Sequence, residues 1–210
     1  MKRVLVFCGS SPGRLPAYTE RAGAMGRLLA ERGLETIYGG ASVGVMGALA
    51  DGALAADGNV IGVIPRRLLE SEIAHAGLTK LHIVETMHER KALMGELADA
   101  VVALPGGTGT LDELFELFTW SQLGLHHKPV GLLDVADYWQ PLLRFLDHAV
   151  AERFLREEHL ETLMVERDPG LLLDRLASHE PRVLDKWLDR RGAAHVPNTR
   201  SPASPKPGRI

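Results

Sequence analysis

Cysteine, aromatic residues and long apolar runs are all scarce in this sequence of 210 residues, of which 5% are aromatic. The one cysteine, Cys8, cannot form a disulfide within the chain, and its apolar neighbours favour a small buried side chain over a nucleophile. No run approaches the roughly 18 apolar residues that a transmembrane helix needs. The apolar stretch at residues 4–8 is too short for a signal peptide. We therefore expect a cytoplasmic protein that does not contact a membrane.

An excess of either charge is also missing. The 24 Lys and Arg residues nearly balance the 27 Asp and Glu residues, so the net charge is −3, and no nucleic-acid partner is expected. The length and the 45% hydrophobic content suffice for one domain, which we place at residues 1–180. We predict a terminal helical segment at 181–189. The Pro- and Ser-rich residues 190–210 are expected to form a disordered tail.

Common cofactor and metal motifs are absent from the sequence. It contains neither a Walker A loop nor the Gly-x-Gly-x-x-Gly dinucleotide motif. Its nine histidines do not follow metal-ligand spacings, since His126 and His127 are adjacent and no His-x-x-x-His pair occurs. We therefore expect neither a metal ion nor a cofactor.

A Gly-rich turn between a predicted strand and a predicted helix is the most informative feature that is present. The apolar run at residues 100–104 leads into Pro105-Gly-Gly-Thr-Gly-Thr110, and a helix-period segment at 111–122 follows. Glycines let backbone N–H groups approach a ligand, and the positive end of the helix points at the same place. The turn suits a phosphate, although a tight connection without a ligand is an alternative for this turn alone.

Apolar runs alternate with helix-period segments along the domain. We predict strands at residues 4–8, 36–38, 59–64, 80–84, 100–104, 130–133 and 162–165, and helices at 18–32, 44–56, 86–97, 111–122, 138–151 and 169–177. This pattern indicates an α/β fold of three layers, with a mostly parallel sheet and helices on both faces. The turns that follow the strands then share one edge of the sheet and can converge on one cleft.

Three charged side chains near these turns are candidates for chemistry. Arg90 shares one face of its predicted helix with Met87, Met94 and Leu97, and it lies at the end of this face near the cleft. The three apolar residues are expected to face the sheet. A guanidinium there needs an anionic partner, either a substrate phosphate or a protein carboxylate. Lys91 lies about 100° further around the helix and is expected to be solvated. Glu113 fits a capping box with Thr110, or it is a carboxylate that polarises a sugar hydroxyl or a water beside the phosphate.

Four motifs occur together over residues 1–180. They are Cys8-Gly-Ser-Ser11, Gly39-Gly-x-x-x-Gly-x-Met-Gly47, Met87-His-x-Arg-Lys91 and Pro105-Gly-Gly-x-Gly-Thr-x-x-Glu113. In this combination the sequence resembles the LONELY GUY (LOG) family of cytokinin riboside 5′-monophosphate phosphoribohydrolases. The resemblance implies a Rossmann-like homodimer that needs no metal or cofactor. It also implies hydrolysis of the N-glycosidic bond of adenosine 5′-monophosphates, often N6-substituted, to free base and ribose 5-phosphate.

The resemblance also assigns roles to residues. Arg90 and Glu113 correspond to the essential pair of the family: the arginine is expected to fix the phosphate, and the glutamate to stabilise positive charge on the sugar and orient water. The turn that contains Gly106, Gly107, Gly109 and Thr110 is expected to hold the phosphate. The other expected substrate-binding residues are Gly9, Ser10, Gly39, Gly40, Met87, Lys91 and Thr108.

Two departures from the family pattern concern substrate preference. Thr108 stands where the family often has a larger residue, and Asp112 where it often has glutamate. Members of the family have also been labelled lysine decarboxylases, but no pyridoxal phosphate signature is present. The alternative function is a non-catalytic carrier of a nucleotide or of the molybdenum cofactor with the same fold.

Overall fold

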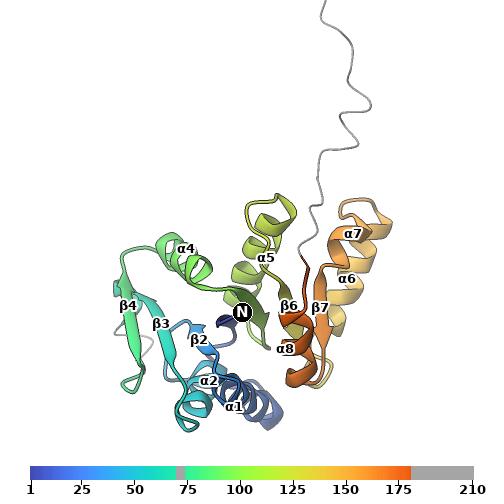
Figure 1. Cartoon of the computed structure of the whole chain (residues 1–210). Coiled ribbons are helices and arrows are strands. Elements are labelled where there is room, and N and C mark those ends of the chain that lie inside the picture. Colours follow the sequence, from blue (N-terminus) through green and yellow to red (C-terminus); the bar gives the residue numbers. More distant parts are fainter. Residues whose placement is uncertain (70–73, 181–210) are drawn as a thin grey trace, which may run out of the picture.

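The computed structural model describes residues 1–69 and 74–180 (Figure 1). The terminal helical segment predicted at 181–189 and the tail predicted at 190–210 lie outside the described residues. Within the described ranges, none of the helices combines the length and the apolar character that a membrane crossing requires.

A seven-stranded sheet forms the middle layer. Its strands lie in the order β4-β3-β2-β1-β5-β6-β7, and all paired neighbours run parallel. The predicted α/β fold is confirmed, and the described strands are entirely rather than mostly parallel. Their bounds are β1 (Arg3–Phe7), β2 (Glu35–Tyr38), β3 (Val60–Pro65), β4 (Lys80–Val84), β5 (Ala100–Ala103), β6 (Val130–Leu133) and β7 (Leu163–Glu166).

The central strands are buried on both faces. Val4 in β1 pairs with Thr36 in β2 on one side and with Ala100 in β5 on the other, and all three are 0% exposed. A strand that has neighbours on both sides and helices on both faces needs apolar side chains at nearly every position. This requirement explains the continuous apolar runs in the sequence.

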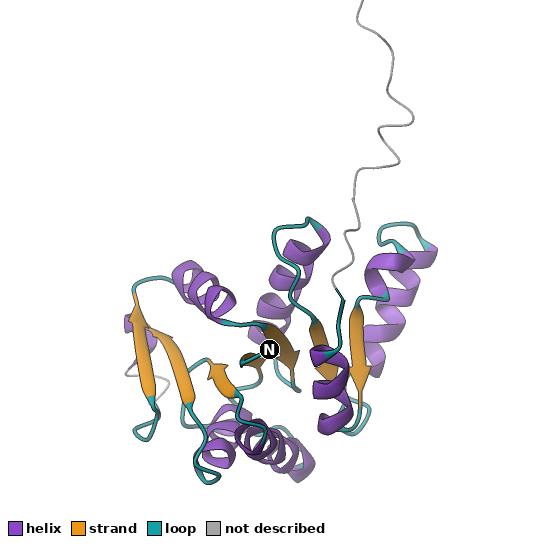
Figure 2. Ribbon diagram, viewed as in Figure 1, coloured by secondary structure: helices purple, strands orange, loops and turns teal. Residues whose placement is uncertain are grey.

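Helices cover both faces of the sheet (Figures 1 and 2). One face packs against α1 (Pro16–Glu31), α2 (Gly44–Leu54) and α8 (Pro169–Ala177), and the other against α4 (Met87–Leu97), α5 (Thr108–Gln122) and α6 (Gln140–Ala151). The sequence did not predict two short helices, α3 (Arg66–Leu69) and α7 (Glu157–Leu160). Each contains four residues, which is too short for a helical period to be recognised.

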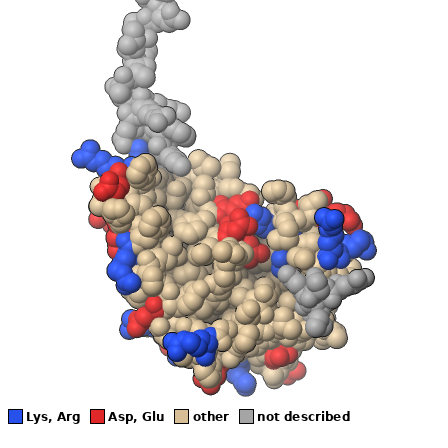
Figure 3. Space-filling view, turned by 180° about the vertical axis from the view of Figure 1, so that it is seen from behind, with Lys and Arg blue, Asp and Glu red and all other residues tan. Residues whose placement is uncertain are grey.

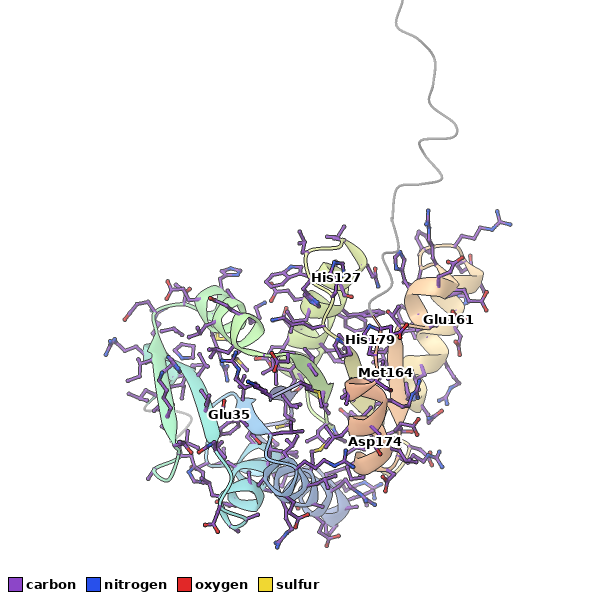
Figure 4. The ribbon with its side chains drawn as sticks, in the orientation of Figure 1. Glu35, His127, Glu161, Met164, Asp174 and His179 are labelled. Carbon is purple, nitrogen blue, oxygen red and sulfur yellow. The ribbon has the colours of Figure 1, made fainter. Side chains whose placement is uncertain are left out.

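Small residues and one ion pair hold the helices of the first face together. An added Cβ on Gly52 in α2 would lie 2.1 Å from the carbonyl oxygen of Gly23 in α1, so these two helices are in backbone contact. Asp174, labelled on α8 in Figure 4, pairs with Arg32 directly after α1, with 2.5 Å between Oδ1 and Nη1. Three helices thereby form one continuous layer.

The order of the strands reverses between β1 and β5. From β1 the chain proceeds outward through β2 to β4, and from β5 it proceeds outward the other way through β6 and β7. In open parallel sheets, ligands bind at the carboxyl ends of the strands where the order reverses. The turns after β1 and β5 lie at this point.

Candidate functional site

The turns after β1 and β5 touch each other through their backbones. The N–H group of Gly9 donates to Pro105 O at 3.1 Å, and an added Cβ on Gly9 would lie 3.2 Å from the Cα of Gly106. The turn that leads into α2 joins them, since an added Cβ on Gly44 would lie 2.3 Å from Ser10 O. Glycine is therefore required at position 44, which also has a φ of +63°, and position 9 leaves little room for a side chain.

A cavity of about 260 Å³ lies at this junction. Its wall includes Gly9, Ser10, Gly106, Gly107 and Tyr138. Four of these residues were predicted to bind substrate, and the structure brings them together. Tyr138 was not predicted.

Helix α5 begins earlier than predicted, and this corrects the interpretation of Glu113 as a capping residue. The helix starts at Thr108, and Gly107 is its N-cap residue. Thr110 is then inside the first turn, so it cannot be the N-cap that a capping box needs. The predicted box of Thr110 and Glu113 is wrong.

Glu113 instead lies beside Arg90, deep between α4 and α5. The two residues are 8% and 3% exposed, and Arg90 Nη1 is 4.0 Å from Glu113 Oε1. The guanidinium also donates from Nε to Val63 O at 3.0 Å and from Nη2 to Gly39 O at 2.9 Å. Arg90 therefore connects the ends of β2 and β3 with a carboxylate on α5.

Gly39 is the residue that makes room for this guanidinium. A Cβ at position 39 would lie 2.2 Å from Arg90 Nη2 and 3.0 Å from Met46 Sδ. Gly40 is buried behind it with a φ of +87°, a conformation that strongly favours glycine. The two glycines of this turn therefore support Arg90 and the bend of the chain.

Lys91 is buried, which contradicts its predicted exposure to solvent. It is 8% exposed, and its Nζ lies 3.0 Å from Glu116 Oε2 and 3.1 Å from Asp112 Oδ2. Burial alone would lower the pKa of Lys91, but the two carboxylates outweigh it and raise the pKa above its ordinary value. Asp112 and Glu116 on α5 thus bind the Lys91 side chain, although its position around the helix predicted that it would be exposed to solvent.

Met87 was expected to face the sheet, and this expectation is also wrong. Its side chain is 41% exposed at the start of α4, and its sulfur lies 3.9 Å from Arg90 Nη1. Met87 is the first residue of α4, and its side chain contacts Arg90. The exposed Met87 side chain therefore lies between the buried guanidinium of Arg90 and solvent.

The remaining predicted residues lie on both sides of the start of α5. Thr108 and Gly109 are exposed there, and an added Cβ on Gly107 or Gly109 would meet nothing within 4 Å. Thr110 is 3% exposed and packs under Gly106, where an added Cβ would lie 2.1 Å from Thr110 Oγ1. The backbone at this helix start faces open space, while the Thr110 side chain supports the turn from within.

Cys8 lies at the end of β1 and is buried, as predicted. Burial, with a further contribution from the negative charge of Glu113, raises the pKa of the Cys8 thiol well above its ordinary value. A thiol that stays protonated is a poor nucleophile. Cys8 is therefore a small packing residue beneath the site.

The turn after β2 contains Gly40-Ala-Ser-Val-Gly44, a Gly-x-Ser-x-Gly spacing that also occurs in nucleophile elbows. His75 is tied to this turn, since its backbone N–H donates to Gly40 O at 3.0 Å. Both of its ring nitrogens have partners, because Nδ1 accepts from Gly77 N at 3.0 Å and Nε2 lies 3.0 Å from Asp51 Oδ1. His75 is thus occupied in structural bonds rather than placed as a base for Ser42.

Other charged groups do not form a second centre on the parts described. No group of three or more His, Cys, Asp or Glu side chains in residues 1–69 and 74–180 could hold a metal ion. On the face seen in Figure 3, the described Lys and Arg side chains are scattered among acidic ones. The candidate site is therefore the cluster of Gly-rich turns with Arg90 and Glu113 at the reversal of the strand order.

The fold and this cluster define a class of protein. This class consists of doubly wound α/β proteins that have a Gly-rich turn and a helix N-terminus suited to an anion. In this protein a buried arginine and a buried glutamate lie beside that helix N-terminus. The family model described as "Possible lysine decarboxylase" matches residues 46–176.

Relatives of known name are similar over most of their length. A cytokinin riboside 5′-monophosphate phosphoribohydrolase of Rhodococcoides fascians is 51% identical over 168 residues, which cover 80% of this chain and 85% of the relative. An enzyme of the same name from Arabidopsis thaliana is 44% identical over 180 residues, or 86% of this chain and 83% of the relative. The chain belongs to the LOG family.

Solved structures confirm the fold. The molybdenum cofactor binding protein of Rippkaea orientalis has a TM-score of 0.66 at 22% identity and covers 85% of this chain and 97% of its own. The molybdenum cofactor carrier protein of Chlamydomonas reinhardtii has a TM-score of 0.65 at 20% identity, with coverage of 85% and 99%. At this identity the likeness concerns the fold alone.

Proposed function

We propose that this protein hydrolyses the N-glycosidic bond of adenosine 5′-monophosphates, including N6-substituted ones, and releases the free base and ribose 5-phosphate. The observation that carries the proposal is the buried pair of Arg90 and Glu113, 4.0 Å apart, next to a helix start suited to a phosphate. A relative that is 51% identical is named for this activity.

The 5′-phosphate is assigned to the start of α5. The first N–H groups of a helix have no intrahelical acceptor, and its dipole favours an anion there. The open space around Gly107 and Gly109 lets phosphate oxygens reach this backbone. Glu113 lies about 9 Å further along the axis, and helical side chains lean toward the N-terminus. A ribose can span the distance that remains.

Glu113 is assigned to the reacting end of the ribose. As the bond between C1′ and the base breaks, its electron pair leaves with the base, and positive charge develops on the sugar. A carboxylate stabilises this charge and accepts a proton from the water that attacks C1′. The base gains one proton in return, so that base and ribose 5-phosphate are the products.

Arg90 is assigned to the orientation of Glu113. The phosphate was expected to be its partner, but two of its nitrogens donate to the carbonyls of Val63 and Gly39. Its Nη1 is the nitrogen nearest to Glu113. We therefore assign the phosphate mainly to the backbone and give Arg90 the task of holding the carboxylate in place.

A homodimer is part of the proposal. Leu111, Phe115 and Trp120 line an open, largely apolar groove along α5, and a second copy of the chain would cover this surface. Light scattering at micromolar concentration measures the mass, and a monomer would contradict this assignment. A cytoplasmic location and the lack of a nucleic-acid partner stay predictions from the sequence.

Product analysis tests the function. The purified protein is incubated with AMP, with N6-isopentenyladenosine 5′-monophosphate and with GMP, and the products are separated by chromatography. Free base and ribose 5-phosphate in equal amounts are expected from the adenine nucleotides. Glu113→Gln is the matched control for a contaminating enzyme. Tight nucleotide binding without turnover would favour the carrier alternative.

A further inference from the structure

The three carbonyl groups of residues 105–107 each accept a hydrogen bond. The Gly9 N–H donates to the first at 3.1 Å, and the Leu111 N–H, inside α5, donates to the third at 3.1 Å. The middle one, Gly106 O, accepts a bond from the Tyr138 hydroxyl. Backbone N–H groups thus fix the carbonyl groups of Pro105 and Gly107, whereas a side chain fixes the carbonyl group of Gly106.

This middle peptide unit carries an N–H group at the proposed phosphate site. In a trans peptide the C=O of one residue and the N–H of the next are coplanar and point in opposite directions. A bond that fixes Gly106 O therefore also fixes the Gly107 N–H, which then points away from Tyr138. Both residues of the unit are glycines, for which rotation of the peptide plane meets little steric resistance. The hydroxyl of Tyr138 opposes that rotation.

The turn after β6 is built so that Tyr138 reaches this carbonyl. Ala136 and Asp137 both adopt left-handed conformations, with φ of +52° and +60°, which non-glycine residues rarely adopt. Buried Asp134 holds the end of the turn, since its Oδ1 accepts from Trp139 N at 2.9 Å. Such a backbone persists only where its surroundings enforce it. The sharp turn at Ala136 and Asp137 thus directs the Tyr138 side chain toward the turn after β5, where its hydroxyl reaches Gly106 O.

A second tyrosine supports the ring without contacting the carbonyl. Tyr18 in α1 packs edge-on against Tyr138, with 5.7 Å between the ring centroids and 76° between the planes. The hydroxyl of Tyr138, rather than aromatic packing in general, makes the bond to Gly106 O. The two tyrosines can therefore be tested separately.

We propose that Tyr138 is a positioning residue that orients the Gly107 N–H toward the 5′-phosphate of the substrate. The proposal rests on the proposed function in so far as it assigns a phosphate ester to this turn. Tyr138 acts through the turn and does not take part in breaking the glycosidic bond.

The test is the affinity of Tyr138→Phe for ribose 5-phosphate, measured by calorimetry well below the melting temperature. Loss of one neutral hydrogen bond that presets a binding group is expected to weaken binding by about threefold to tenfold. The KM for AMP is expected to rise by a similar factor, while kcat changes less. Tyr18→Phe is the matched control, because it removes a hydroxyl from the same ring pair, and its affinity is expected to equal that of the wild type.

Several results would overturn the role of Tyr138. They are an affinity of Tyr138→Phe within twofold of the wild type, equal weakening in Tyr18→Phe, or failure of the wild type to bind ribose 5-phosphate. A drop in melting temperature with unchanged affinity would indicate a purely structural hydroxyl and also overturns it. If the wild type binds ribose 5-phosphate but releases no base from any nucleotide, the proposed function fails, and the affinities alone decide on Tyr138.

Discussion

Substituting Gly39 by alanine perturbs Arg90 without removing any charged group. The new Cβ would lie 2.2 Å from Arg90 Nη2, whereas ordinary contact begins at 3.4 Å. The guanidinium must therefore retreat by roughly 1 Å, which breaks its 2.9 Å bond to Gly39 O and changes its position relative to Glu113. A hydrogen bond to a charged group is worth about 1.5–3 kcal/mol, so we expect a similar loss in the free energy of unfolding.

The loss of activity in Gly39→Ala is expected to exceed the loss of stability. The end of a long side chain can move more easily than the backbone, so the fold is retained while the arginine no longer holds Glu113. We expect kcat for base release from AMP to fall by more than about tenfold, because misplacing a catalytic group by 1 Å has effects of order 10². Steady-state kinetics and urea unfolding measure the two effects on the same samples.

Gly23→Ala is the matched control for Gly39→Ala. An added Cβ there would lie 3.4 Å from Ala48 O of the neighbouring helix α2, which is an ordinary contact distance. Replacing glycine within a helix is expected to leave activity unchanged and to stabilise the protein by up to about 1 kcal/mol. If Gly39→Ala retained full activity, or if its Arg90 still donated to residue 39 in a crystal structure, the role assigned to this glycine would be refuted.

Three further substitutions test the charges. Glu113→Gln keeps the shape of the side chain but removes its charge, so we expect kcat to fall by about 10²–10⁴ with little change in KM; near-normal single-turnover base release would contradict its role. Arg90→Lys cannot donate to two carbonyls and also reach the carboxylate, so urea titration should show a loss of about 2 kcal/mol, and an unchanged midpoint would argue against the network. Burial would raise the pKa of Asp99, but two backbone N–H groups at the start of β1 outweigh it and hold the pKa below its ordinary value of 3.8. The stability that ionised Asp99 contributes is fully present above pH 3.8 and is lost as the pH falls through the lowered pKa of the folded state. The difference in melting temperature between the wild type and Asp99→Asn should therefore shrink on acidification.

The sequence predicted the sheet well because each strand carries its own pattern. The strands predicted at 80–84 and 130–133 coincide with β4 and β6, and the helix predicted at 169–177 coincides with α8. Buried parallel strands need continuous apolar residues, and Gly and Pro mark the turns between them. The position of the site at the sheet edge then followed from the alternation of strands and helices.

The start of α5 was missed for a local reason. The segment Thr-Gly-Thr has low helix propensity, and Gly107 caps the helix without a side-chain bond. The spacing of Thr110 and Glu113 resembles a capping box, so the sequence predicted a helix start that is three residues later than the observed one. The error mattered, because the late start supplied the capping alternative for Glu113, and the observed start of α5 removes that alternative.

The burial of Lys91 and the contact of Tyr138 with the Gly-rich turn were missed because their partners lie far away along the chain. The helical angle places Lys91 on one side of α4, but only the packing of α5 brings Asp112 and Glu116 to it. Tyr138 is 32 residues from Gly106, and a backbone turn with two left-handed residues brings them together. Such contacts are tertiary, so neither periodicity nor motif spacing predicts them.

The proposed reaction requires a nucleotide to bind with its phosphate at the start of α5 and its ribose beside Arg90 and Glu113. The most direct measurement is a crystal structure of Glu113→Gln with AMP, in which the bond to be cleaved stays intact. We predict that the phosphate contacts the N–H groups of residues 107–109 and that C1′ lies beside the side chain at position 113. A phosphate bound elsewhere, or a C1′ turned away from that side chain, would contradict the proposed roles of the α5 start and Glu113.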